Sequence, residues 1–355
     1  MESVRLNQRL VQALGEVGVR ASRPQLENLA LLCQALAFSR DCHLASLALH
    51  LPIAGCRASR TQRLRRWLKN AHLDVPACYA PVRQELLRNG TGQEVCLVLD
   101  RTDIACDLSI LLLGLAYHKR VLPLVWQVLR FGGTGVAQHL PLLQQVQPDL
   151  PAGHPVWLLA DSEFRSLAVQ AWCRTHAWHW QVGVSRELVI RDASGAPHAL
   201  HQLGLQLGER RYLQGVYLSH DHPFGPVNLI ADWAPRQSAP RYWTLDLPAD
   251  ARAWRYGRKR FWIEPTFRDW KGAGFDLEAS LLRDPQRLDH LLLALALTQL
   301  WLLHIGEWLR RSGRATEFSP QPADYSLFRL GRDYLQRSQC CPAYIPVDFH
   351  IDGYA

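Results

Sequence analysis

Apolar residues recur at helical spacing through the first fifty positions of the chain. Leu6, Leu10 and Leu14 stand four apart, and a similar series begins at Leu26. This period places apolar side chains on one face of a helix. Residues 1–50 are therefore predicted to form short helices, each with one buried face.

The segment 57–69 continues the helical pattern and concentrates positive charge. Ser59 with Gln62 three residues later forms a capping box, which predicts that a helix starts there. Six of these residues are basic and none is acidic, which favours contact with DNA phosphates over an ordinary solvated face. The helix would bury three apolar residues and present three cations on the opposite side: Leu64, Trp67 and Leu68 against Arg65, Arg66 and Lys69.

Continuous apolar runs predict a buried sheet in the middle of the chain. The segments 94–100 and 154–161 are predicted strands that end in Asp100 and Asp161. Between them, 108–130 predicts two strands with a turn near His118 and Lys119. Helical segments follow these strands, so the pattern indicates an α/β fold. Carboxylates at strand C-terminal ends lie where open α/β sheets form their sites.

A β-rich insertion is predicted after this core. Short alternating strands broken by Gly, Pro, Asn and Asp extend from about residue 185 to 250. The chain is thus divided into a helical domain at 1–90, a core at 91–184 and 251–312, the insertion at 185–250 and a C-terminal tail at 313–355.

The most apolar run, residues 288–306, is interrupted by polar side chains that include Asp289, Gln299 and His304. These interruptions favour a buried helix over a membrane span. The nine cysteines form no C-x-x-C pair, and the N-terminal decapeptide lacks an apolar signal region. We therefore expect a cytoplasmic protein.

Positive charge is concentrated at one end of the chain. The formal net charge is +8, and residues 1–88 hold 13 Lys or Arg against 6 Asp or Glu. This asymmetry indicates a polyanionic partner, either nucleic acid or an anionic membrane surface. The absence of a strong amphipathic anchor argues against the membrane.

Three acids, Asp100, Asp161 and Glu264, lie on separate predicted elements of the core. Carboxylates that converge in this way suit hard divalent cations. Two Mg²⁺ ions about 4 Å apart can activate a water or hydroxyl and stabilise the leaving oxygen of a phosphoryl displacement. A single aspartate at a strand end is more often a turn or a helix cap, so the prediction rests on the combination.

Glu264 stands in the basic and aromatic segment YGRKRFWIEPTFRDWK, residues 256–271. A carboxylate for metal would there be surrounded by cations for phosphates; the alternative is an amphipathic helix with i,i+4 ion pairs. Pro265 disfavours helical geometry at Glu264, so either the helix kinks there or Pro265 is its first residue and Glu264 its cap. On an unbroken helix four residues would lie within about 80° of one another, with Tyr256 adjoining: Arg260, Glu264, Arg268 and Lys271.

This segment resembles the bacterial insertion-sequence transposases of the DDE type, family four. That family carries a Tyr-Arg-Glu-Lys signature with two, three and six residues between successive members. Arg260, Glu264 and Lys271 keep the spacings of three and six, whereas Tyr256 stands one residue too early and Gly257 occupies the expected position. The motifs VLDRTDI and LLADSEFRS, which contain the two aspartates, are similar to the first and second acid motifs of the family.

The resemblance implies a ribonuclease-H-like mixed-sheet core with a β-rich insertion, an N-terminal DNA-binding domain and a helical C-terminal part. It implies cut-and-paste transposition in the bacterial nucleoid, with hairpin formation and resolution. The partners would be double-stranded DNA, as terminal inverted repeats and target, and a second protomer in a homodimer. Asp100, Asp161 and Glu264 would hold two Mg²⁺ ions, for which Mn²⁺ can substitute. DNA contacts would come from Tyr256, Arg260, Arg268, Lys271, Arg65, Arg66 and Lys69, and from Trp243, which would stack on a flipped base or simply pack the insertion.

Two other functions remain open. A metal-dependent nuclease on the same fold would cut DNA without joining it, and strand-transfer products would distinguish the two enzymes. An inactive or domesticated DNA-binding relic would bind without cutting, and the presence of all three acids argues against it.

Overall fold

The N-terminal apolar pattern forms two long helices, α1 (Glu2–Glu16) and α2 (Arg23–Phe38), which pack against each other. The predicted helices are therefore confirmed, but they are longer than expected. The computed structural model describes residues 2–39, 41–105, 107–192, 195–218, 223–272 and 274–351. Three further helices complete this part of the chain: α3 (Leu44–Leu47), α4 (Arg57–Leu68) and α5 (Val75–Asn89).

Helix α4 begins earlier than the sequence predicts. Its N-cap is Cys56, so Ser59 lies inside the helix and the predicted capping box is wrong. The helix therefore gains residues 57–59, and the Arg57 side chain donates to the backbone oxygen of Ala45 in α3 at 3.1 Å. The faces are as predicted, because Leu64, Trp67 and Leu68 are buried and the cations Arg65, Arg66 and Lys69 are exposed.

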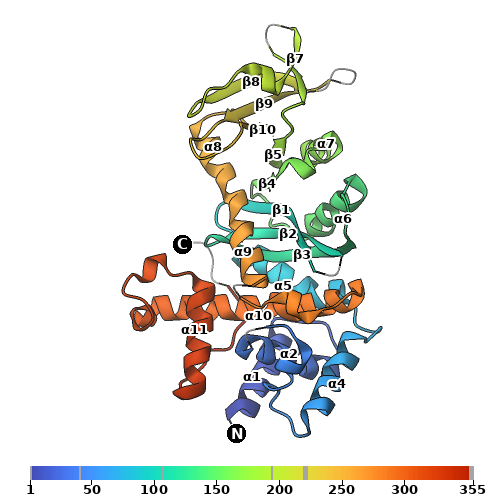
Figure 1. Ribbon diagram of the computed structural model, residues 1–355, viewed down its shortest axis with the longest axis vertical. Helices are drawn as coiled ribbons and strands as arrows, with labels where there is room; N and C mark the ends of the chain where they lie inside the picture. The colour runs from blue at the N-terminus through green and yellow to red at the C-terminus, as the bar shows by residue number, and fades with distance from the viewer. Residues whose placement is uncertain are drawn as a thin grey trace.

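A ten-stranded mixed sheet occupies the middle and upper part of the molecule in Figure 1, with its strands following one another along the long axis. Its order is β3-β2-β1-β4-β5-β10-β9-β8-β6-β7, with β1, β4 and β5 parallel and the remaining pairs antiparallel. Strand β10 pairs with β5, so the predicted β-rich insertion continues the core sheet. The strands are β1 (Val95–Ile104), β2 (Leu108–Tyr117), β3 (Arg120–Arg130), β4 (Val156–Ala160), β5 (His179–Val184), β6 (Val189–Arg191), β7 (Pro197–Ala199), β8 (Arg210–Leu218), β9 (Phe224–Asp232) and β10 (Arg241–Leu245).

The predicted turn between β2 and β3 is confirmed. His118 and Lys119 have φ values of 43° and 62°, as a two-residue hairpin turn of the primed type requires. In contrast, β1 does not end at Asp100 as predicted. It continues to Ile104 because its second half pairs with β2 over Asp100–Ile104.

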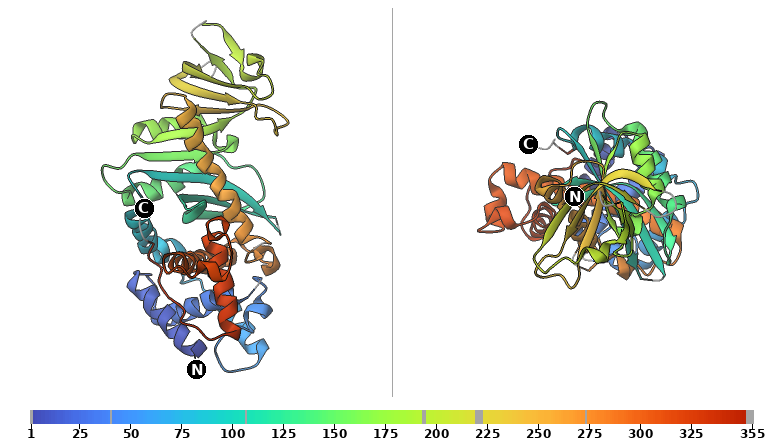
Figure 2. Two further views of the ribbon diagram at one scale, coloured as in Figure 1. Left: turned by 90° about the vertical axis from the view of Figure 1, so that its left-hand side faces the viewer. Right: turned by 90° about the horizontal axis from the view of Figure 1, so that it is seen from above.

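Helices cover both faces of the sheet. Helices α6 (Val136–Val146) and α7 (Leu167–Thr175) lie on one face, and α8 (Ala251–Gly257) and α9 (Ile263–Trp270) lie on the other (Figures 1 and 2). A 3₁₀ turn at Arg258–Trp262 joins α8 to α9. This turn interrupts the helix before Pro265, so the structure has neither a kink at Pro265 nor Glu264 as a cap.

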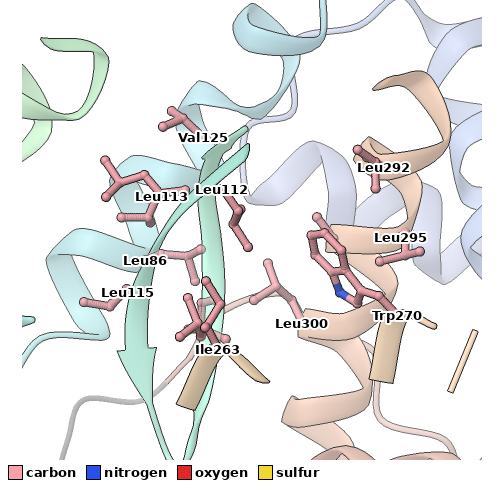
Figure 3. Close-up of a cluster of buried hydrophobic side chains, with 14 of the residues drawn as sticks. Leu86, Leu112, Leu113, Leu115, Val125, Ile263, Trp270, Leu292, Leu295 and Leu300 are labelled. Atoms are coloured by element: carbon pink, nitrogen blue, oxygen red, sulfur yellow. The ribbon is translucent and has the colours of Figure 1, made fainter. Parts of the chain in front are cut away.

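Helix α10 (Pro285–Arg311) lies between the sheet and the N-terminal helices, in contact with β3 and α2 (Figure 1). It is long and apolar enough to span a membrane, but 89% of its apolar window is buried, as predicted for a core helix. Leucines of α10 and β2, together with Val125 of β3, form a buried cluster with Ile263 and Trp270 of α9 (Figure 3).

The segment predicted as a C-terminal tail contains helix α11 (Leu327–Cys340), which packs on α10. Gly306 and Gly331 permit this close approach, since a Cβ at either position would overlap the backbone of the facing helix.

Candidate active site

Parallel pairing of β1 and β4 brings the first two acids to the same level of the sheet. Leu99 of β1 is in register with Ala160 of β4. Asp100 is the residue after Leu99 and Asp161 is the residue after Ala160, so the two aspartates stand at equivalent positions along neighbouring strands. Asp100 is therefore inside a strand, whereas Asp161 begins the turn after β4. Gly183 on β5 allows this turn to approach, because a Cβ there would lie 2.8 Å from the Ser162 nitrogen.

Both aspartates are held by a nearby backbone amide. The Arg101 N–H donates to Asp100 Oδ1 at 2.8 Å, and the Glu163 N–H donates to Asp161 Oδ1, also at 2.8 Å. These bonds orient one oxygen of each carboxylate and leave the second available to other partners.

The third acid, Glu264, lies in the first turn of α9, whose buried neighbours Ile263 and Trp270 anchor the helix in the core. Its side chain is 56% exposed. Arg260 connects it to the sheet, since Nη1 lies 3.0 Å from Asp100 Oδ2 and Nη2 lies 3.7 Å from Glu264 Oε1. The structure therefore brings Arg260 and Glu264 together with Asp100, and the Arg260–Glu264 contact is the i,i+4 ion pair of the alternative given above.

Burial is the main cause of a raised pKa at Asp100. The carboxyl pKa rises from 3.8 to about 6; repulsion from Asp161 and Glu264 adds to the increase, while Arg260 and the Arg101 amide oppose it. Three negative charges near one another in a partly buried site favour either a proton or a cation.

A cleft of about 510 Å³ opens beside these residues. Trp243 of β10 faces it and is the direct sheet partner of Gly183. The same indole also packs against a small apolar cluster that includes Ile230 and Leu245 of the insertion, so the predicted packing of Trp243 is observed, and its stacking on a base stays a prediction. The charged residues that line the cleft are Asp161, Glu264, Arg165, Arg186, Arg241 and Arg260.

Tyr256 lies outside the cleft lining. Its ring is half-buried and packs against Trp157 with 4.4 Å between centroids, and Lys259 Nζ lies 4.0 Å from its centroid. Gly257, at the position where the family signature has its tyrosine, is pressed against Gln181, and a Cβ there would overlap that buried side chain. A larger residue at position 257 would require the Gln181 side chain to move.

The other predicted cations lie apart from the cleft. Lys271 Nζ donates to the backbone oxygen of Asp103 on β1. Arg268 lines a different depression of about 650 Å³ together with Arg120 and Arg332. On α4, Arg65 and Lys69 line a groove of about 440 Å³ that also contains Arg287, whereas Arg66 does not line it.

Sequence reasoning missed three arginines of the cleft and one ion pair. Arg165, Arg186 and Arg241 stand on separate elements, and no local spacing connects them. Arg101 and Glu163 form an ion pair at 2.9 Å. Their positions, one and two residues after the predicted catalytic aspartates, were the only signal in the sequence.

The residues suit a divalent cation in their donor chemistry, since all three acids supply hard oxygen ligands. Within the described ranges no group of three His, Cys, Asp or Glu side chains is arranged to hold an ion. Arg260 occupies the position between Asp100 and Glu264. An ion that used both carboxylates would have to displace its guanidinium.

The chain was compared with known protein families and solved structures. Residues 113–301 match the transposase DDE domain family, a range that exceeds half of the chain, includes Asp161 and Glu264, and begins after Asp100. The fold is similar to that of the piggyBac transposase in a synaptic complex with hairpin DNA, with a TM-score of 0.51 and 12% identity over 96% of this chain and 80% of that chain. Comparison with curated proteins gives no match. The chain therefore belongs to the transposase DDE domain family.

Proposed function

We propose that this protein is an insertion-sequence transposase of family four that cuts and joins double-stranded DNA by phosphoryl transfer at Asp100, Asp161 and Glu264. The observation that carries the proposal is the approach of these acids from β1, the end of β4 and α9, with Arg260 bridging two of them. Membership of the transposase DDE domain family supports it.

The cleft fits a DNA strand by its charge. Four arginines surround two of the acids, and arginine is well suited to phosphate because its planar fork binds two oxygens. Arg260 would exchange its carboxylate partners for a phosphate when a strand enters. Lys271, at the end of α9 and outside the cleft lining, would contact a neighbouring part of the DNA.

Transposases of the DDE class use divalent ions, and Asp100, Asp161 and Glu264 are the residues that would hold them here. Bound there, two Mg²⁺ ions would activate the attacking water or 3′-hydroxyl and stabilise the leaving oxygen. Asp100 would present its carboxylate from β1 and Asp161 from the turn after β4, and Glu264, 56% exposed, would supply the third ligand.

The cut-and-paste pathway would proceed through a DNA hairpin, as the resemblance to family four implies. A hairpin requires a sharply bent strand, which an aromatic side chain can relieve by stacking on a flipped base. Trp243 lines the cleft at the level of Gly183, together with Tyr242 and Phe261, and we assign the stacking role to Trp243 because of its position late in the insertion. A homodimer would bring the two terminal repeats together.

The test is a denaturing-gel assay of the purified protein on DNA that contains its own flanking sequences, with Mg²⁺ or EDTA. We expect Mg²⁺-dependent nicks at the element boundary, then hairpins and strand-transfer products, all abolished by Glu264→Gln with little loss of DNA binding. Glu317→Gln is the matched control, because Glu317 pairs with arginines in the C-terminal part. Cleavage retained by Glu264→Gln would refute the metal assignment, nicks without joining would indicate a nuclease, and binding without cleavage would indicate a relic.

A further inference from the structure

The two aspartates are connected through the side chains that follow them. Arg101 supplies the amide that holds Asp100, and Glu163 supplies the amide that holds Asp161. Their side chains meet across β1 and the turn after β4, with Arg101 Nε 2.9 Å from Glu163 Oε1. The two backbone donors that orient the carboxylates are thus joined by one ion pair.

A third segment closes this network. Arg101 Nη1 donates to the Gly132 carbonyl at 2.9 Å, in the loop after β3, and also contacts Asp103 Oδ1 at 2.9 Å. From the same loop Thr134 donates its hydroxyl to Glu163 and contacts His139 Nε2 at 2.8 Å. The pair is therefore fixed on both sides and is only 18% and 25% exposed.

We propose that Arg101 and Glu163 form a positioning pair that holds Asp100 and Asp161 in the relative orientation needed to bind divalent cation. Neither side chain lines the cleft, so the pair would act through the aspartates and not on DNA. This inference rests on the proposed function, since it assigns a role in forming the same site.

The expected loss of cation affinity can be taken from other residues that orient metal ligands. Losing such a partner typically weakens metal affinity by about 10- to 100-fold. A surface ion pair of purely structural value would change stability slightly and leave cation affinity as it was.

The experiment measures Mn²⁺ binding to the DNA-free protein by calorimetry, together with the melting temperature and the Mg²⁺ concentration that half-saturates cleavage. Arg101→Gln removes a positive charge near the carboxylates. A charge effect alone would tighten cation binding, whereas lost positioning would weaken it by about 10-fold or more. Glu163→Gln should weaken it similarly, and the charge-neutral double variant should resemble either single variant, because all three remove the same interaction.

The control is Asp149→Asn, which disrupts a more buried ion pair with Arg83 (8% and 10% exposed for Arg83 and Asp149) outside the cleft lining. It should lower the melting temperature at least as much as Glu163→Gln and leave cation affinity unchanged. If Arg101→Gln does not fold, Arg101→Lys, which keeps the charge but loses the planar fork, should show a smaller loss of affinity.

Tighter Mn²⁺ binding in Arg101→Gln, or unchanged binding in Glu163→Gln, would overturn the positioning role. A wild-type protein that binds Mn²⁺ but never cleaves DNA would instead refute the proposed function. The two failures are therefore distinguishable.

Discussion

The raised pKa of Asp100 predicts that removing this acid stabilises the fold. The increase from 3.8 to about 6 corresponds to about 3 kcal/mol of unfavourable free energy for the ionised carboxylate. The folded protein binds this proton more tightly than the unfolded chain does. Protonation therefore contributes stability that is full below pH 3.8 and is lost as the pH rises through about 6.

Asp100→Asn should imitate the protonated carboxyl at every pH. At pH 8 it should be more stable than the wild type by about 3 kcal/mol, which for a chain of this length raises the melting temperature by about 4 °C. At pH 5 the wild-type carboxyl is largely protonated when folded, so the difference should shrink to about half. The same variant should lack DNA cleavage.

Differential scanning calorimetry in EDTA at pH 5 and pH 8 measures this difference. Asp324→Asn, at an exposed position, serves as the control and should change the melting temperature by less than about 1 °C. The reasoning is refuted if Asp100→Asn melts at or below the wild type at pH 8, or if its advantage is the same at both pH values.

Three other variants test the remaining parts of the site. Arg260→Gln should bind Mn²⁺ at least about tenfold more tightly than the wild type in the absence of DNA, because a cation 3.0 Å from Asp100 is removed. The same variant should cleave DNA more slowly. Weaker Mn²⁺ binding in calorimetry would contradict this expectation. Trp243→Ala should still nick DNA but should form hairpins about 10- to 100-fold more slowly than the wild type. The hairpin rate of Trp243→Phe should lie between those of Trp243→Ala and the wild type. Equal loss of nicking and hairpin formation would point to a packing role alone. Replacing Arg65 and Lys69 with Ala should reduce the log-log salt slope of DNA binding by about 0.9 for each phosphate that the protein no longer neutralises, and an unchanged slope would place the DNA elsewhere.

The sequence predicted that Asp100 and Asp161 lie at neighbouring strands of the sheet because the signals for these strands are local. Apolar runs that lead into Asp100 and Asp161 identify strands, and parallel strands bring matching positions to one level. The end of β1 was missed because the strand is extended by pairing with β2, which is a property of two segments. The continuation of the sheet through β10 was missed for the same reason, since strand order is set by interactions between distant residues.

The cations were harder to place than the acids. An unbroken helix would align Arg268 and Lys271 with Arg260, but the 3₁₀ turn before Ile263 and the end of α9 at Trp270 change their directions. The contact made by Gly257 could not be predicted from the sequence, because it involves a residue of a distant strand. The Gly257 backbone lies against the Gln181 side chain, which a larger residue at position 257 would displace.

Packing also determines where the basic face of α4 stands relative to the acids. His290 of α10 contacts the Leu68 carbonyl at the end of α4 through Nδ1 at 2.9 Å, and both residues are buried. The same helix bonds to α9, because the indole of Trp270 donates to Gln299 at 2.6 Å. The N-terminal helices are therefore packed onto the core through α10, at the end of the molecule opposite β10 (Figure 1). If α4 binds phosphates as proposed, this packing sets the distance from the bound DNA to Glu264, and with it the number of base pairs between the contacted segment and the bond that is cut.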